Sequence, residues 1–128
     1  MGRIVTRVTI ENPAEPGKRI ETDALVDTGA YIMTLPAAWR DRLGKLRNCE
    51  EVEIHLATEQ TVTGSVCGPV FVQMPGFRQI SSEVLFLEME AANGEYEPLI
   101  GYITLEQSQA AVDMVGHRLT HIRHVDVK

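Results

Sequence analysis

The sequence has no block of Lys or Arg and no apolar run long enough to cross a bilayer. Its 128 residues carry a formal net charge of −6, whereas phosphate groups and anionic membrane surfaces attract clustered positive charge. We therefore expect neither nucleic acid nor a membrane as a partner. The N-terminus also lacks a charged segment followed by an apolar one, which is typical of a secretion signal. These absences together predict a cytoplasmic protein.

Cysteine is scarce as well. The two cysteines, Cys49 and Cys67, are eighteen residues apart and belong to no ligand-like pair. We expect two reduced thiols, with Cys67 half-buried in a strand. A disulfide or a redox role is the alternative.

Alternating apolar and polar residues predict a mainly β fold. Apolar residues make up 44% and charged residues 23% of the chain, which is typical of a globular protein. The length suits a single domain over residues 1–128. The predicted strands are residues 3–10, 20–26, 52–56, 61–66, 70–74, 80–87 and 118–125. The first two form a hairpin around a wide loop, and the strands at 52–56 and 61–66 form another.

Two short helices are predicted between the strands. Pro36 suits a first helical position and Gly44 suits a stop, so the first helix covers residues 36–43. Trp39 and Leu43 are one turn apart and are expected to face the core. The second helix, residues 104–111, is predicted from its helix-forming composition. Asp113 follows it, where a strand-edge or turn role is expected.

Three histidines near the C-terminus suggest zinc at first sight. His117 falls in a predicted turn, however, and His121 and His124 would face opposite sides of a strand. Zinc requires ligands that converge on one point. We therefore expect no metal site.

One segment contains a candidate catalytic residue. Asp27 follows the apolar residues 24–26 and precedes Thr28 and Gly29. A charge at the end of a buried strand is costly unless something stabilises it. Gly29 lets the backbone turn, so that its amide can point back at the carboxylate. The tripeptide alone also fits a plain turn, but the apolar run before it and Ala30 after it favour a functional site.

The segment 24–30, Ala-Leu-Val-Asp-Thr-Gly-Ala, resembles the active-site signature of retropepsin-type aspartic proteases. A second landmark of that family, two apolar residues and a glycine before the C-terminal helix, matches Leu99, Ile100 and Gly101. The resemblance covers residues 20–119 and is closest to small stand-alone prokaryotic members. The sequence departs from many retroviral-like relatives at Ile103, where those often carry Asp.

The resemblance implies a retropepsin-like acid-protease β-barrel with one lobe per subunit. A short helix would follow the Asp-Thr-Gly loop, and another would lie near the C-terminus. Hydrolysis by this route needs two carboxylates across one water, and a homodimer supplies the second Asp27 by symmetry. The expected function is an aspartic endopeptidase that cleaves extended polypeptides without a cofactor.

The same resemblance assigns the site residues. Asp27 is catalytic, Thr28 braces the pair across the dimer axis, and Gly29 gives a backbone contact to the carboxylate. Residues 55–64 would form a flap that closes over the peptide. The expected substrate-binding residues are Ala30 in the cleft and, at the flap tip, Ala57, Thr58, Glu59 and Gln60.

Two other interpretations of the sequence stay open. A catalytically silent peptide-binding or dimerisation module would keep this fold without activity. A structural β-barrel half could carry the Asp-Thr-Gly turn by accident, and it would be monomeric.

Overall fold

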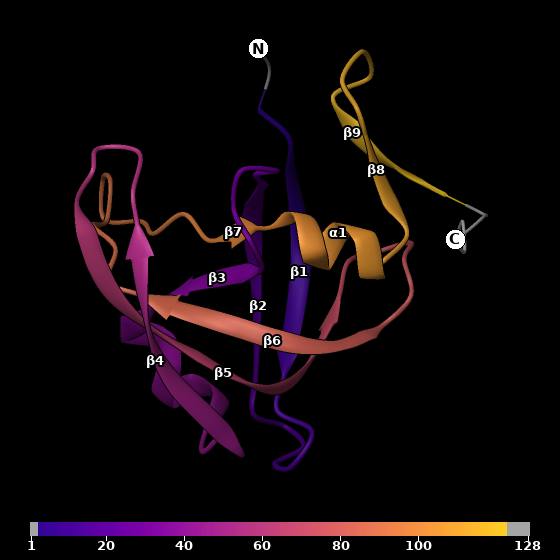
Figure 1. The fold of residues 1–128 in the computed structure, drawn as a ribbon. Helices are drawn as coiled ribbons and strands as arrows, with labels where there is room; N and C mark the ends of the chain where they lie inside the picture. Colours follow the sequence, from indigo (N-terminus) through magenta and orange to yellow (C-terminus); the bar gives the residue numbers. More distant parts are fainter. Residues whose placement is uncertain (1–2, 123–128) are drawn as a thin grey trace, which may run out of the picture.

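The computed structural model describes residues 3–122, which are mainly strands, as the sequence predicts (Figure 1). The elements are β1 (Val5–Glu11), β2 (Arg19–Val26), β3 (Met33–Pro36), η1 (Ala37–Leu43), β4 (Asn48–His55), β5 (Thr61–Gln73), β6 (Ile80–Leu87), β7 (Leu99–Ile100), α1 (Tyr102–Gln107), β8 (Ala110–Asp113) and β9 (Arg118–His121). None of the helices in the described part of the chain has the length and apolar character to cross a membrane.

Seven strands form one sheet in the order β1-β2-β7-β3-β6-β5-β4, and β8 pairs with β9 in a separate hairpin. Strand β1 also pairs with β5, so the sheet curls back on itself (Figure 1). The predicted hairpin of the first two strands is confirmed by the antiparallel register from Val5↔Leu25 to Glu11↔Arg19. Alternate residues point inward, and Val8 and Ile10 of β1 are completely buried beside Ile20 of β2. This alternation gives the sheet one apolar face around the core.

Some predicted boundaries are wrong. The strands expected at 61–66 and 70–74 are a single strand, β5, with an irregularity between Cys67 and Val70 where its register to β6 shifts. The second helix covers Tyr102–Gln107 rather than residues 104–111. Gln109 adopts a left-handed backbone with φ of 57°, and residues 110–113 pair with 118–121 instead. Strand pairing therefore overrides the helical propensity of this segment.

The first predicted helix exists as the 3-10 helix η1. Pro36 lies at the end of β3, directly before the helix, and Gly44 ends it with φ of 69°. Leu43 is completely buried, as expected. Trp39 is half-buried and packs edge-on against Tyr96, with ring centroids 5.9 Å apart.

The prediction of two reduced thiols is wrong, because Cys49 and Cys67 form a disulfide. The two residues are directly opposite in the β4–β5 register, which brings their Cα atoms to 4.1 Å. Cys67 is completely buried rather than half-buried. Strand β4 begins at Asn48, whereas the predicted strand began at residue 52, so the alternation pattern gave no sign of this cross-strand pair. The bond ties the two strands together at the end of the hairpin away from its turn.

Reducing this disulfide is expected to lower the free energy of unfolding by about 3 kcal/mol, the value for a loop of this length in the chain-entropy account. Urea unfolding of the wild-type protein with and without dithiothreitol measures the difference. The Cys49→Ala, Cys67→Ala double variant is the control and should not respond to reductant. Equal stability of the reduced and oxidised wild-type protein would contradict the prediction.

The turn between β8 and β9 is built on Asp113, which confirms its expected turn role. The amides of Val115 and Gly116 donate to its Oδ1 at 3.1 and 2.9 Å, and Arg118 Nε lies 3.3 Å from Oδ2. The bond from the Gly116 amide, with the Arg118 guanidinium also contributing, holds the pKa of the Asp113 carboxyl below its usual value. His117 lies in this turn as predicted, with φ of 52°, and His124 lies outside the described residues.

We expect an Arg118→Gln variant to raise the pKa of Asp113 toward its usual value without reaching it, because both backbone amides remain. A lowered pKa in the folded state means that the carboxylate stabilises the fold above its unfolded pKa of about 3.9, and this contribution is lost as the pH falls through the lower folded value. A ¹³C NMR titration of the carboxyl carbon measures both proteins. A wild-type pKa at the ordinary aspartate value would contradict the account.

Candidate active site

Asp27 lies immediately after the last residue of β2, where a short parallel pairing fixes it. Leu25 and Val26 pair with Leu99 and Ile100 of β7. The Asp27 amide then donates to the Ile100 carbonyl at 3.0 Å. The two sequence landmarks of the resemblance, far apart in the chain, are therefore adjacent in space.

The turn after Asp27 has the geometry expected from its glycine. The Gly29 amide donates to Asp27 Oδ1 at 2.9 Å, and the Ala30 amide donates to the Asp27 carbonyl at 3.0 Å. The Asp27 side chain is half-buried, whereas Thr28 is exposed. Within residues 3–122, the Thr28 hydroxyl makes no hydrogen bond to another group of the chain. It is available to an external partner.

The start of α1 clamps this turn from the other side. Tyr102 and Ile103 donate their amides to the carbonyls of Ala30 and Tyr31, both at 3.0 Å. The buried Thr104 hydroxyl accepts the Met33 amide at 3.1 Å. Sequence reasoning missed Thr104, because a single threonine in a helical pattern gives no signal of such a bond.

Gly101 allows this close approach. A Cβ atom there would lie 2.5 Å from the Ile32 nitrogen and 2.5 Å from the Tyr31 carbonyl carbon. Both neighbours are backbone atoms, so they cannot rotate away as a side chain could. The glycine of the second landmark is therefore required by contact with the turn after Asp27.

A cleft of about 640 Å³ opens above the Asp27 turn. Asp27, Gly29 and Ala30 line one wall, and residues 52–57 of β4 and the following turn line the opposite wall. Most of the other lining side chains are apolar: Ile32, Val66, Leu85, Leu87 and Leu99. An apolar cleft with one carboxylate on its wall suits a substrate with apolar side chains and a polar group to be attacked.

A second groove of about 420 Å³ adjoins the other side of Asp27 and Thr28. Arg3 and Ile4 line it near the N-terminus, and Met114 lines it from the β8–β9 hairpin. Asp27 therefore lies between two hollows, and only one of them faces the β4–β5 hairpin.

The expected flap is the hairpin of β4 and β5. Its turn is closed by bonds from the Leu56 amide to the Gln60 carbonyl at 2.9 Å and from the Glu59 amide to the Leu56 carbonyl at 3.0 Å. Glu59 has φ of 67°, a conformation that favours glycine. Ala57 lines the cleft, whereas Thr58 and Gln60 lie with Glu59 at the exposed tip. The structure thus brings Ala57 to the same cleft as Asp27 and Ala30.

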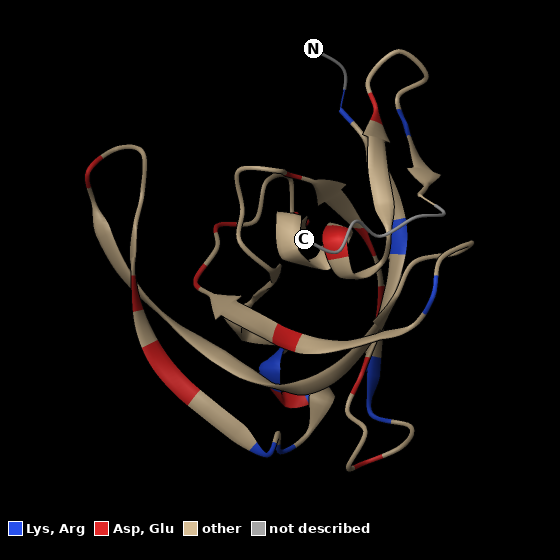
Figure 2. Cartoon of the chain, turned by 45° about the vertical axis from the view of Figure 1, so that its right-hand side comes forward, with Lys and Arg blue, Asp and Glu red and all other residues tan. Residues whose placement is uncertain are grey.

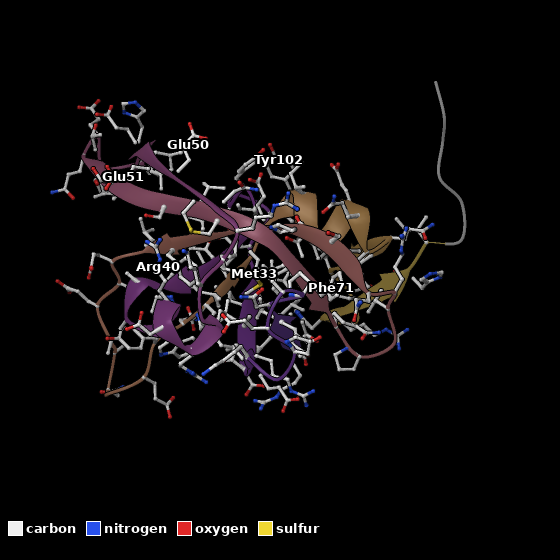
Figure 3. All side chains as sticks on the ribbon, turned by 90° about the horizontal axis from the view of Figure 1, so that it is seen from below. Met33, Arg40, Glu50, Glu51, Phe71 and Tyr102 are labelled. Carbon is white, nitrogen blue, oxygen red and sulfur yellow. A yellow bond between two sulfur atoms is a disulfide. The ribbon has the colours of Figure 1, made fainter. Side chains whose placement is uncertain are left out.

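Charge is spread unevenly over the molecule. Figure 2 shows acidic and no basic residues along the β4–β5 hairpin, whereas both kinds occur on the other elements. Glu50 and Glu51 are exposed on β4 (Figure 3). Among residues 3–122, no group of three or more His, Cys, Asp or Glu side chains is placed to hold a metal ion.

Comparison with known proteins finds a likeness in the fold. No family model matches the chain, and no curated protein matches it. Among solved structures it is similar to the EIAV protease complexed with the inhibitor HBY-793, with a TM-score of 0.60 and 22% identity over 82% of this chain and 86% of that one. At this level of identity the likeness concerns the fold. The chain has the mainly β, retropepsin-like fold of a retroviral protease.

Proposed function

We propose that this protein is an aspartic endopeptidase that acts as a homodimer, with one Asp27 from each subunit. The observation that carries the proposal is the position of Asp27 on the wall of a largely apolar cleft, held there by the Gly29 amide at 2.9 Å. The fold is that of a protease. The proposed reaction needs two such carboxylates, and each subunit supplies one.

The edge of the molecule that carries Asp27 supports a second copy as the partner. The turn of the β4–β5 hairpin, the loop between β2 and β3, and the β8–β9 hairpin all reach the same edge, at the top of Figure 1. Met114 and Val115 in the β8–β9 turn are 60% and 93% exposed. Large apolar side chains that are exposed together often mark an interface. A two-fold axis at this edge would bring two Asp27 loops together.

The proposed mechanism follows from the repulsion between the two carboxylates. Two carboxylates a few ångströms apart cannot both ionise, so the pair holds one proton in common. One member accepts a proton from the attacking water, and the other hydrogen-bonds the carbonyl of the scissile peptide. A site that needs one protonated and one ionised carboxyl group is expected to lose activity on both the acidic and the alkaline side of its optimum.

The remaining site residues have supporting roles in this proposal. Thr28, whose side chain is exposed, would bond across the dimer axis and hold the two loops in register. Ala30 and Ala57 would contact the substrate on opposite walls of the cleft. The other flap-tip residues, Thr58, Glu59 and Gln60, would pack over an extended peptide once the hairpin closes.

The flap tip favours one alternative, a catalytically silent peptide-binding module. Glu59 occupies a left-handed position that glycine fills at no steric cost, so the tip is stiffer than a glycine-rich flap. Such a module would bind extended peptides as a dimer and release them uncleaved.

The proposal also includes the branch of the family. We infer a small stand-alone protease of the prokaryotic type, from the sequence landmarks given above. The sequence predicts a cytoplasmic location, but the Cys49–Cys67 disulfide argues against it. Disulfides persist mainly in oxidising compartments.

The experiment is digestion of an unfolded protein at mildly acidic pH over a wide range of enzyme concentration. If the site needs two subunits, activity per milligram rises with concentration and levels off where sedimentation shows a dimer. A stable dimer that cleaves nothing across a broad pH range would favour the silent module. Constant specific activity down to concentrations where the protein is monomeric would refute the shared site.

A further inference from the structure

Two tyrosines beside the catalytic loop are exposed although nothing in the chemistry above uses them. Tyr31 and Tyr102 are 57% and 41% exposed. Their rings contact each other edge to face, with centroids 5.9 Å apart and an angle of 64° between the ring planes. Figure 3 shows the Tyr102 side chain projecting outward from the start of α1. Aromatic rings carry a large apolar surface, so an exposed pair gains free energy when something covers it.

The backbone beneath the pair is firmly held. The Tyr31 carbonyl accepts the Ile103 amide at 3.0 Å, and the Tyr102 amide donates to the Ala30 carbonyl at 3.0 Å. Gly101 packs directly against the backbone of residues 31 and 32. The two rings are therefore presented by the same rigid junction that positions Asp27.

One ring of the pair, that of Tyr31, also lines the cleft. Tyr31 lines the 640 Å³ cleft together with Asp27, which it follows closely along the same loop. Tyr102 extends the aromatic surface from Tyr31 toward α1. When the scissile bond of a bound peptide lies at Asp27, a side chain some residues away from that bond would contact this aromatic surface.

We propose that Tyr31 and Tyr102 form an aromatic platform that selects peptides with an aromatic side chain at a position removed from the scissile bond. The inference rests on the proposed function for its account of cleavage. Aromatic side chains suit this surface because they stack offset or edge to face on exposed rings. The Tyr31–Tyr102 platform thus determines specificity and takes no part in the chemical step.

A binding selection tests the platform without any need for turnover. A displayed library of random peptides is selected on the Asp27→Asn protein, and on the same protein with Tyr31→Ala, Tyr102→Ala or Tyr31→Phe added. We expect aromatic residues to be enriched at one position and the enrichment to fall about five-fold in both alanine variants, the size of one aromatic pair contact. Tyr31→Phe should retain the preference.

The matched control is Tyr96→Ala, which removes the third tyrosine of the chain from a different aromatic pair, with Trp39. It should leave the preference unchanged. An enrichment that survives both alanine variants, or a library that gives no enriched peptides, would overturn the platform. So would a Tyr31→Ala variant that dissociates in sedimentation while keeping its peptide preference, because the pair would then be a subunit contact.

Cleavage mapping separates this inference from the proposed function. The wild-type protein and Tyr31→Ala digest the same unfolded protein, and mass spectrometry locates the cut bonds. We expect Tyr31→Ala to raise KM for sites with the distant aromatic residue while kcat changes little. Cleavage that depends on Asp27 but not on Tyr31 would refute only the platform. A Tyr31-dependent peptide preference in a protein that never cleaves would refute only the protease.

Discussion

Asp27→Asn is expected to lower kcat by about 10²–10⁴-fold, the usual contribution of general acid–base catalysis. The amide of asparagine has nearly the shape of the carboxyl group, but it can neither take a proton from water nor share one with its symmetry mate. The Gly29 amide, 2.9 Å from Asp27 Oδ1, can still donate to the asparagine oxygen. The loop should therefore keep its conformation, and the loss of activity should come without a loss of stability.

Glu53→Gln provides the control, because among the described residues Glu53 is the other carboxylate that lines the cleft. It lies on β4 and is exposed. If the second acid came from the same chain, this variant would be as inactive as Asp27→Asn. We expect it to cleave the unfolded protein like the wild type, with unchanged thermal unfolding. Full activity in Asp27→Asn would end the proposal of an aspartic protease.

Gly101→Ala is expected to have the largest effect on stability, about 3 kcal/mol or more, at the upper end of the cost of overpacking. The new methyl group would lie 2.5 Å from the Ile32 nitrogen and 2.7 Å from the Ile32 oxygen. To relieve the clash, α1 or the loop after Asp27 must move. Movement would weaken the bonds from Tyr102 and Ile103 to the loop. Urea unfolding measures the stability, and the digestion assay measures the accompanying loss of activity.

The matched control for this variant is Gly94→Ala. Gly94 has φ of 79°, and a Cβ atom added to it would meet nothing within 4 Å, so the same change there costs only backbone strain of about 1–2 kcal/mol. Activity should survive it, because the turn at Gly94 lies outside both hollows around Asp27. Equal losses of stability in Gly101→Ala and Gly94→Ala would mean that the contact between Gly101 and the loop after Asp27 does not contribute.

The strands in which apolar and polar residues alternate along the sequence were predictable. The β1–β2 hairpin combines alternation with a Pro and Gly turn, and it was placed correctly. Strands β3 and β7 were not predicted as strands. All four residues of β3 are buried, and β7 has two residues, so neither segment shows a period of two. Their pairing depends on segments that are distant in the sequence.

The site was predictable where a local motif defines it. The bond from the Gly29 amide to the carboxylate follows from the residues 27–29 alone. The roles of Thr104 and of the Tyr31–Tyr102 pair were not predictable, because they exist only where the start of α1 crosses the loop. The Cys49–Cys67 disulfide was likewise not predictable, because it depends on the register of β4 against β5.

Mixing wild-type and Asp27→Asn subunits tests the shared site most directly. The two proteins are unfolded together, refolded in varying ratios, and assayed at a concentration where sedimentation shows dimers. If each active site holds one Asp27 from each subunit, mixed dimers are inactive and activity per wild-type subunit falls in proportion to the wild-type fraction. Activity per wild-type subunit that stays constant at every ratio would show that Asp27 works within one chain, and it would contradict the account.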